Sequence, residues 1–344
     1  MKKILILIVS SMLYGLTACE TILPVDMPKG EEWGITLNAI ASPDTTFRAY
    51  VTKCYPNSEV PEYIYPTIVN EDGYFERYPY SHYYAGYIHD WERWENDRII
   101  KESVLADAEV ILTVNQETTF SMQYDAEQLC FLSDYIPSIG DHLEVRISNA
   151  ASGEETVAHT EVPRPQKLEI LELKKQKREA ESIGNYKEHV QMKLRLHDPI
   201  EEKNYYRLKI RRMDYNYESF FYLRDVYQSS DPIFKDNRLT TAWGSWEAYF
   251  SDVFDDRLIN GQMYEFYIET DTELSIYKEW KPIFEISLQS ITEDYYHYLK
   301  SLQIYRISTL STYSEGVYIH SNNEGGWGIL GAISGEVHRI EIAK

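Results

Sequence analysis

Alternation of apolar and polar side chains with a period of two is the feature that most restricts the fold of this chain. The alternation is clearest at residues 143–147, 190–196 and 206–210. It leaves one face of a strand buried and the other in water, as in antiparallel sheets. Further strands are expected at residues 35–40, 47–54, 108–114 and 337–342 and around Tyr264. Short strands with turn signals between them predict sandwiches or barrels.

The predicted fold class is mainly β, with two antiparallel β-sandwich or barrel-like domains. The boundary is placed at residues 162–165, Val-Pro-Arg-Pro, because two prolines at alternate positions stiffen a connector and cannot lie inside a central strand. The first domain, residues 31–163, is expected to be Ig-like. The second domain covers residues 166–344.

One helix is predicted in the second domain, at about residues 291–304. Ser290 and Glu293 fit a capping box, in which the two side chains satisfy free amides at the start of the helix. Apolar side chains then recur at helical spacing, at Tyr295, Tyr298, Leu299 and Leu302. The helix is therefore expected to cover one sheet or to close its end.

Residues 55–103 lie between two predicted strands of the first domain and are rich in tyrosine, tryptophan and proline. A connection this long is functional or disordered in most proteins, and its many aromatic side chains argue for an ordered insertion. Two interpretations stay open: the aromatic side chains form a satellite core, or some of them face outward as a binding surface. The candidates for such a surface are Tyr83, Tyr84, Tyr87, Trp91 and Trp94.

The first 18 residues have the order of an export signal: Lys2 and Lys3, a short apolar core, and then Leu-Thr-Ala-Cys at residues 16–19. The apolar core is too short to span a membrane. The last four residues resemble the bacterial lipobox, which implies cleavage before Cys19 and acylation of its thiol. Two or more acyl chains would hold the protein to a lipid bilayer, with residues 19–30 as a tether. The alternative is an ordinary signal peptide in which Cys19 has no role.

Removal of residues 1–18 takes away two lysines and no acidic residue, so 34 basic residues become 32 against 55 acidic ones, a net charge of −23. Nucleic-acid binding needs a basic surface and is therefore not expected. Of the three cysteines, Cys54 and Cys130 remain once Cys19 is acylated. They form either a disulfide, which an oxidising compartment permits, or two buried thiols.

No sequence motif predicts a catalytic, cofactor-binding or metal-binding residue. Residues 326–331 match G-x-G-x-x-G, but no βαβ pattern surrounds them, so a tight turn or bulge between C-terminal strands is expected instead. His82 and the pair His89-Asp90 are too scattered to predict a metal site. The acidic pair Asp255-Asp256 is assigned to a solvated turn. The protein is therefore expected to be non-enzymatic and to carry no cofactor.

The C-terminal order of motifs is similar to that of a known family. Tyr264-Glu265-Phe266 is followed by the aromatic helix, by Ser321-Asn322-Asn323 and by the glycine-rich residues 325–331. This order resembles a family of Bacteroidota lipoproteins known as domain of unknown function 4249. The Ser42-Pro43-Asp44 turn agrees more loosely. The resemblance implies an outer-membrane lipoprotein often found beside TonB-dependent receptors, and it supplies no catalytic residue.

Three functions follow from these observations. The first is a non-enzymatic accessory or ligand-binding component associated with a TonB-dependent receptor and exposed at the cell surface rather than in the periplasm. The second is a surface adhesin or fimbria-like subunit, which needs an open sheet groove and a removable strand for donor-strand exchange. The third and least favoured is a glycan hydrolase, which needs two carboxylates about 5–10 Å apart beside aromatic side chains.

Overall fold

The computed structural model describes most of the predicted strands and the helix. The described residues are 34–53, 68–69, 75–76, 103–179, 186–200, 202–213, 220–221, 227–239, 249–250, 252–270, 283–308 and 318–341. The predicted mainly β fold, with one helix near the C-terminus, is confirmed.

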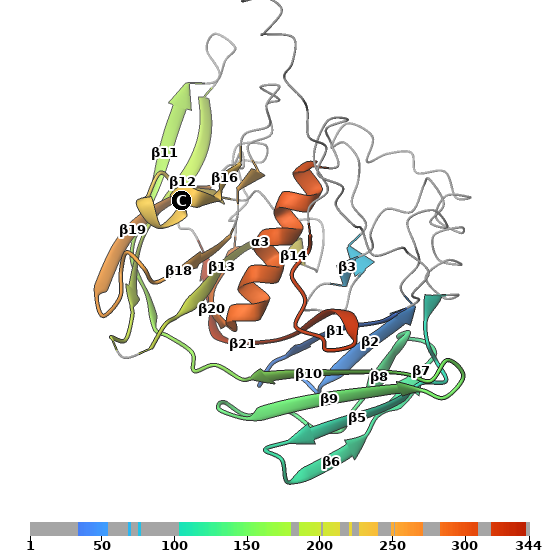
Figure 1. Cartoon of the computed structure of the whole chain (residues 1–344). Coiled ribbons are helices and arrows are strands. Elements are labelled where there is room, and N and C mark those ends of the chain that lie inside the picture. The colour runs from blue at the N-terminus through green and yellow to red at the C-terminus, as the bar shows by residue number, and fades with distance from the viewer. Residues whose placement is uncertain are drawn as a thin grey trace, which may run out of the picture.

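Within the described residues, one nine-stranded sheet runs across the fold (Figure 1). Its order is β14-β13-β20-β21-β1-β2-β8-β7, and β18 also pairs with β13. The bounds of these strands are β1 Ile35–Ala41, β2 Arg48–Lys53, β7 Gln123–Asp125, β8 Cys130–Leu132, β13 Tyr205–Met213, β14 Phe220–Phe221, β18 Val253–Asp255, β20 Ile283–Ile291 and β21 Gly326–Glu341.

Two four-stranded sheets pack against parts of this sheet, in the orders β10-β9-β5-β6 and β11-β12-β19-β15. Their strands are β5 Glu109–Val114, β6 Thr118–Ser121, β9 His142–Asn149, β10 Glu154–Glu161, β11 Leu168–Glu179, β12 Tyr186–His197, β15 Tyr227–Gln228 and β19 Met263–Thr270. The remaining elements are the strand pairs β3 Ile68–Val69 with β4 Phe75–Glu76 and β16 Arg238–Leu239 with β17 Tyr249–Phe250, the 3-10 helix η1 Pro232–Asn237 and the α-helix α3 Glu293–Ser308.

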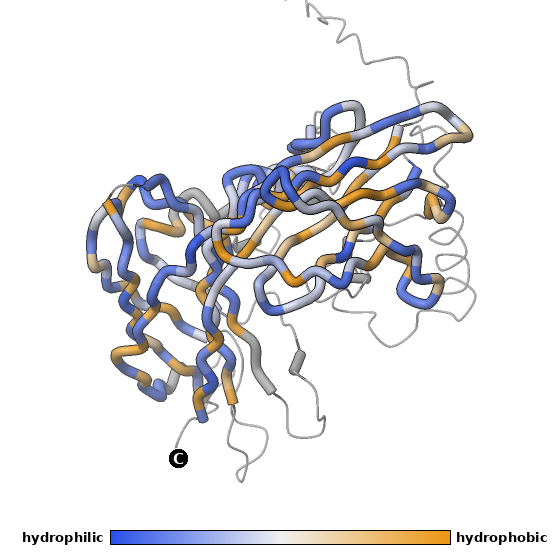
Figure 2. The backbone as a smooth tube through the Cα atoms, turned by 90° about the horizontal axis from the view of Figure 1, so that it is seen from below, coloured by the Kyte–Doolittle hydropathy of each residue, from blue (hydrophilic) through white to orange (hydrophobic). Residues whose placement is uncertain are grey.

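The period-two alternation decides which side chains are buried. Leu143, Val145 and Ile147 of β9 are at most 2% exposed, while the residues between them face outward. Hydrophobic and hydrophilic positions alternate in the same way along the tubes of Figure 2. The buried faces form two separate main cores, one between β1-β2 and β10-β9-β5 and one between β13-β20 and β11-β12-β19. These are the two predicted sandwiches.

Strand β21 belongs to both sandwiches. Its first part, Gly326–Ala332, pairs in parallel with β1, and its second part, Ile333–Glu341, pairs antiparallel with β20. Leu330 and Ala332 are fully buried in the first core. The proline connector at 162–165 does separate β10 from β11, but the end of the chain returns to complete the sheet of the first sandwich.

The prediction of a tight turn or bulge at residues 326–331 is wrong, because these residues form continuous strand beside β1. The glycines serve close backbone packing. A Cβ at Gly326 would lie 2.5 Å from the Ile35 carbonyl oxygen, and one at Gly328 would lie 2.1 Å from that of Leu37. Gly328 also has a φ of 99°, a conformation that favours glycine.

The capped helix is present, but the predicted capping box is wrong. Ser290 lies inside β20, paired with Tyr206 on one side and Ser334 on the other, so its backbone is held extended. The helix starts two residues later than a Ser290 cap requires, and Thr292 accepts the N–H of Tyr296 at 2.9 Å. The predicted apolar positions are confirmed, since Tyr295, Tyr298 and Leu299 pack onto the sheet and Leu302 is buried.

The solvated turn predicted for Asp255-Asp256 is also wrong in part. Asp256 is only 2% exposed, and its carboxylate accepts the backbone N–H of Asn204 at 2.7 Å. Its carbonyl accepts the N–H groups of Ile259 and Asn260 at 2.8 Å. The carboxylate of Asp256 can be buried because it accepts a backbone N–H where β13 begins. Asp255 pairs with Arg257, which is exposed.

The outer face of β11-β12-β19 carries a row of ion pairs that gives a pH prediction. Lys167 and then His197 lower the pKa of Glu169 to about 2, from its usual 4.5. A carboxyl whose pKa is depressed in the folded state contributes stability above its unfolded pKa. We therefore expect the Glu169 contribution to be present above pH 4.5 and lost as the pH falls towards 2. Carboxyl-carbon NMR titration measures this pKa directly. In Lys167→Ala the pKa is expected to rise, and an unchanged value would contradict the assignment.

Candidate functional site

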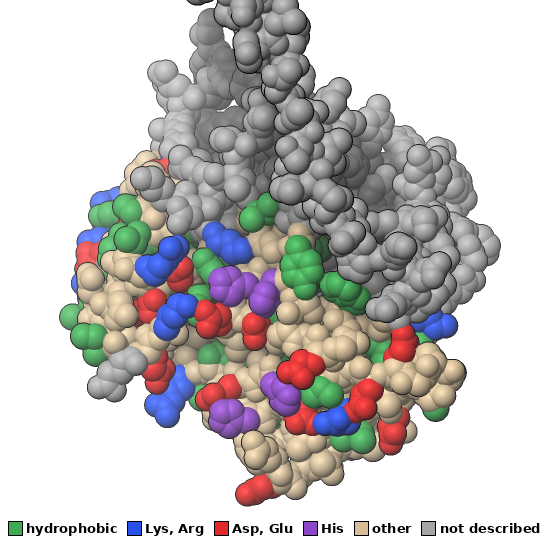
Figure 3. Space-filling model, in the orientation of Figure 1, with side chains coloured by type: hydrophobic (Ala, Val, Ile, Leu, Met, Phe, Trp, Pro, Cys, Tyr) green, Lys and Arg blue, Asp and Glu red, His purple; other side chains and the backbone are tan. Residues whose placement is uncertain are grey.

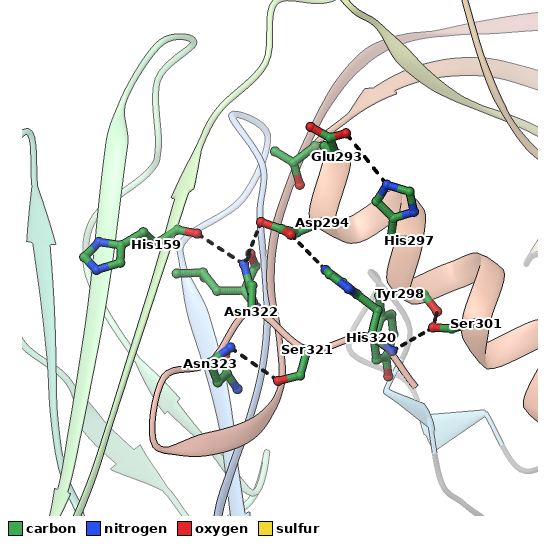
Figure 4. A network of polar contacts seen from close by, with 12 residues as sticks. His159, Glu293, Asp294, His297, Tyr298, Ser301, His320, Ser321, Asn322 and Asn323 are labelled. Carbon is green, nitrogen blue, oxygen red and sulfur yellow. Dashed lines mark hydrogen bonds and ion pairs between the residues drawn. The ribbon is translucent and has the colours of Figure 1, made fainter. Parts of the chain in front are cut away.

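A network of polar side chains lies where the start of α3 meets residues 318–325 (Figure 4). The His320 Nε2 atom lies 2.8 Å from an Asp294 carboxylate oxygen, and the His320 backbone N–H donates to the Ser301 hydroxyl at 2.8 Å. Asp294 is in the first turn of the helix, where a negative charge is favourable. These contacts attach the segment before β21 to the helix.

Asn322 connects three elements through its side-chain amide. Its oxygen accepts the Leu330 N–H at 2.9 Å. Its nitrogen lies 2.9 Å from the Leu330 carbonyl oxygen and 3.2 Å from that of His159, and 3.4 Å from an Asp294 carboxylate oxygen. Asn322 therefore joins β10, β21 and α3, and all three contacts are internal to the protein.

The residues that follow Asn322 bond inward in the same way. The Asn323 amide donates to the Leu37 carbonyl at 3.1 Å and also to the Trp327 carbonyl. Glu324 exchanges backbone hydrogen bonds of 2.8 and 3.0 Å with Val157 of β10. We call residues 321–330 the Asn–Gly segment. Its polar groups hold the first sandwich to the start of β21.

A second set of side chains, the acid–histidine cluster, consists of Glu293, Asp294, His297 and His320. The two imidazole rings have centroids 5.6 Å apart, and His297 Nε2 lies 3.7 Å from a Glu293 oxygen. The histidine side chains are 49% and 32% exposed. Figure 3, in the orientation of Figure 1, shows histidines beside acidic and basic side chains in the middle of the face towards the viewer.

Lys203 and Tyr205 extend the cluster towards β13. Lys203 lies 2.6 Å from Glu293, and the Tyr205 hydroxyl donates to the same carboxylate. Lys203, and then Tyr205, lower the pKa of Glu293. Burial, and then the Glu293 hydrogen bond, raise the pKa of Tyr205. Glu293 is therefore ionised and Tyr205 neutral at pH 7.

The geometry of the cluster does not assemble a nucleophile. A histidine bonded to an aspartate is the base half of a catalytic triad, and a serine would be needed at the other side of the ring. The two serines nearby are used otherwise. The Ser301 hydroxyl donates to the Tyr298 carbonyl at 3.0 Å, and the Ser321 hydroxyl accepts the Asn323 N–H at 3.3 Å. The His320–Asp294 pair instead positions a loop.

In the described ranges, no group of three or more His, Cys, Asp or Glu side chains is arranged to hold a metal ion. The predicted binding residues Tyr83, Tyr84, Tyr87, Trp91 and Trp94 lie outside the described residues, as do Cys19, His82 and His89. Cys130 is buried in β8, and burial raises the pKa of its thiol to about 11. Its possible partner Cys54 lies outside the described residues, so the disulfide stays a prediction.

A comparison with family models matches residues 21–339 to the family described as Domain of unknown function (DUF4249). The chain belongs to this family. The matched range includes both sandwiches, the helix and the Asn–Gly segment. No curated protein and no solved structure matches the chain. No helix in the described part of this family member is both long and apolar enough to cross a membrane.

The sequence holds one signal for the structural role of the Asn–Gly segment. Asn322 and Asn323 stand directly before a run of glycines. Asparagine side chains commonly form hydrogen bonds with backbone groups where a chain turns, and this preference indicates a structural role. Their partners Leu37 and His159 are far away in sequence, so the contacts themselves could not be predicted.

Proposed function

We propose that this protein is a lipid-anchored, non-enzymatic accessory component of an outer-membrane TonB-dependent receptor, exposed at the cell surface. The observation that carries the proposal is the position of the lipobox-like Leu-Thr-Ala-Cys. It follows the short apolar core, and the family match begins at residue 21, two residues after Cys19. The family domain therefore occupies nearly all of the chain that acylation and signal cleavage would leave.

The geometry near α3 supports a binding role over a catalytic one. The side chains of Asn322, Asn323 and Asp294 bond to other parts of the same chain. These three side chains, which have the chemical types of catalytic residues, thus stabilise the fold of the described structure. A rigid scaffold suits an accessory protein that presents a fixed surface to a partner.

The position of β1 disfavours the adhesin alternative. Donor-strand exchange requires a strand that can be removed and replaced. β1 lies between β2 and β21, and Ile35, Leu37 and Ala41 are 0% exposed. Removal of this strand would open the first core, so we do not propose a fimbria-like subunit.

The anchor is tested by Cys19→Ala. We expect this variant to lose incorporation of radiolabelled palmitate and to leave the membrane fraction, because the thiol that accepts the lipid is gone. The matched control is Cys54→Ala, which keeps the lipobox and should label normally. Undiminished palmitate labelling of Cys19→Ala would contradict acylation at this residue.

The receptor association is tested by affinity purification from outer membranes through a tag at the C-terminus. We expect a TonB-dependent receptor to copurify with the acylated protein. Proteinase added to intact cells should degrade the protein, as expected for surface exposure. Purification without any such receptor, from cells shown to express one, would overturn the accessory role. Protection in intact cells and cleavage only after lysis would place the protein in the periplasm instead.

A further inference from the structure

Two aromatic side chains are exposed at the start of β21. Tyr318 is 66% exposed and Trp327 is 41% exposed, and their ring centroids lie 6.2 Å apart. Large apolar side chains that stand together on a surface mark binding sites more often than isolated ones do. This aromatic pair is therefore the feature from which we infer a further contact.

Trp327 is held firmly in place. Its backbone pairs with Thr36 of β1, and its carbonyl accepts a hydrogen bond from Asn323. The indole lies against Gly34, where a Cβ atom would come within 3.2 Å of the ring. The exposed ring thus stands on rigid strand and beside the residue that precedes β1.

The contact with Gly34 places the pair near the point where the tether enters the fold. Only 14 residues separate Cys19 from Gly34. A chain of this length reaches at most roughly 50 Å when extended. Its average span is about 20 Å when unrestrained. An acylated Cys19 would therefore keep Gly34, and the aromatic pair beside it, within this reach of the bilayer.

Tryptophan and tyrosine side chains favour the region of lipid headgroups, where the ring is buried and its polar atom stays in water. A tether raises the effective concentration of the bilayer, so a weak interaction is sufficient. We propose, on the basis of the anchor proposed above, that Tyr318 and Trp327 rest in the headgroup region of the bilayer that holds Cys19.

The charge of the protein indicates which lipid surface fits. Without residues 1–18 the chain has 32 basic and 55 acidic residues, a net charge of −23, and Glu324, between Tyr318 and Trp327 in sequence, is exposed. Like charges would repel an anionic lipid surface. A phospholipid headgroup surface is therefore the occupant, and a zwitterionic one should hold the pair better than an anionic one. Contact should weaken when anionic lipid replaces part of it, and more so at low salt.

The test uses the full acylated protein, labelled with fluorotryptophan, in vesicles of phosphatidylethanolamine and phosphatidylcholine. The resonance of Trp327 is assigned by its loss in Trp327→Phe, which keeps an aromatic ring against Gly34. A lipid with a spin label at the headgroup is then added. We expect the Trp327 resonance to broaden several-fold more than that of a control tryptophan.

The control is Tyr267→Trp, because Tyr267 is 47% exposed on β19, which belongs to a different sheet from β21 and lies at the left of Figure 1, away from the start of β21 beside β1. Equal broadening of the two resonances would overturn the inference. Flotation of the vesicles is measured on the same sample. If the protein floats with the vesicles but the Trp327 resonance stays sharp, the membrane contact is overturned and the anchor is not. If wild-type protein is not acylated and does not float, the anchor itself is refuted.

Discussion

Gly328→Ala is expected to lower the free energy of unfolding by about 4 kcal/mol, the largest loss we predict for a single substitution. Gly328 has a φ of 99°, which an alanine adopts only with strain. Its new Cβ would also lie 2.1 Å from the Leu37 carbonyl oxygen. That oxygen belongs to β1, which is paired on both sides and cannot move away. Urea denaturation of residues 19–344, followed by circular dichroism, measures the loss.

The matched control for this substitution is Gly153→Ala. Gly153 also has a positive φ, 73°, but no atom lies within 4 Å of the position its Cβ would take. Only the backbone strain should remain, with a loss of about 1 kcal/mol. Similar losses for the two variants would show that close contact with Leu37 does not matter, and the parallel pairing of β21 with β1 would then be in doubt.

Asn322→Ala is expected to lower the free energy of unfolding by about 3 kcal/mol. The substitution removes both hydrogen bonds between the side chain and the Leu330 backbone, and also the contact with His159. Leu330 is fully buried, so its N–H would be left without an acceptor. An unsatisfied buried donor is the most costly part of such a change. The same denaturation experiment measures it.

Asn260→Ala is the control for this second substitution, since Asn260 is exposed in the turn before β19. Its stability should change by less than about 0.5 kcal/mol. If Asn322→Ala were equally harmless, the Asn–Gly segment would not hold the first sandwich to the start of β21. Asn322→Ala should leave acylation of Cys19 unchanged, because the two roles are independent.

The parts of the fold set by local periodicity could be predicted from the sequence. The buried face of β9 follows from alternation at Leu143, Val145 and Ile147, and the packed face of α3 follows from helical spacing. Both patterns arise between neighbours in the chain, so the sequence contains them in full.

Features decided by distant parts of the chain could not be predicted in this way. The glycines at 326–331 have the composition of a turn, and only the approach of β1, nearly 300 residues earlier, makes them a strand. Serine is a residue type that favours helix caps, but sheet pairing with Tyr206 and Ser334 keeps Ser290 in β20. The sequence around Asp256 predicts a solvated side chain, because the Asn204 N–H that its carboxylate accepts is distant in sequence.

The candidate site was predictable only in its location. The family motif led to the Asn–Gly segment, but it did not indicate that Asn322 bonds to His159 and Leu330 rather than to a ligand. The hydrogen-bond partners of a side chain depend on the tertiary structure, and a sequence motif does not specify them. The aromatic candidates Tyr83, Tyr84, Tyr87, Trp91 and Trp94 stay predictions.

Because β21 pairs with β1 of the first sandwich and β20 of the second, we expect β21 and the Asn–Gly segment to make the two sandwiches unfold as one unit. Scanning calorimetry of residues 19–344 tests it most directly. We expect one transition, with equal calorimetric and van't Hoff enthalpies. Asn322→Ala should move that transition as a whole to lower temperature. Two separate transitions in the wild-type protein, of which Asn322→Ala moves only one, would contradict the claim.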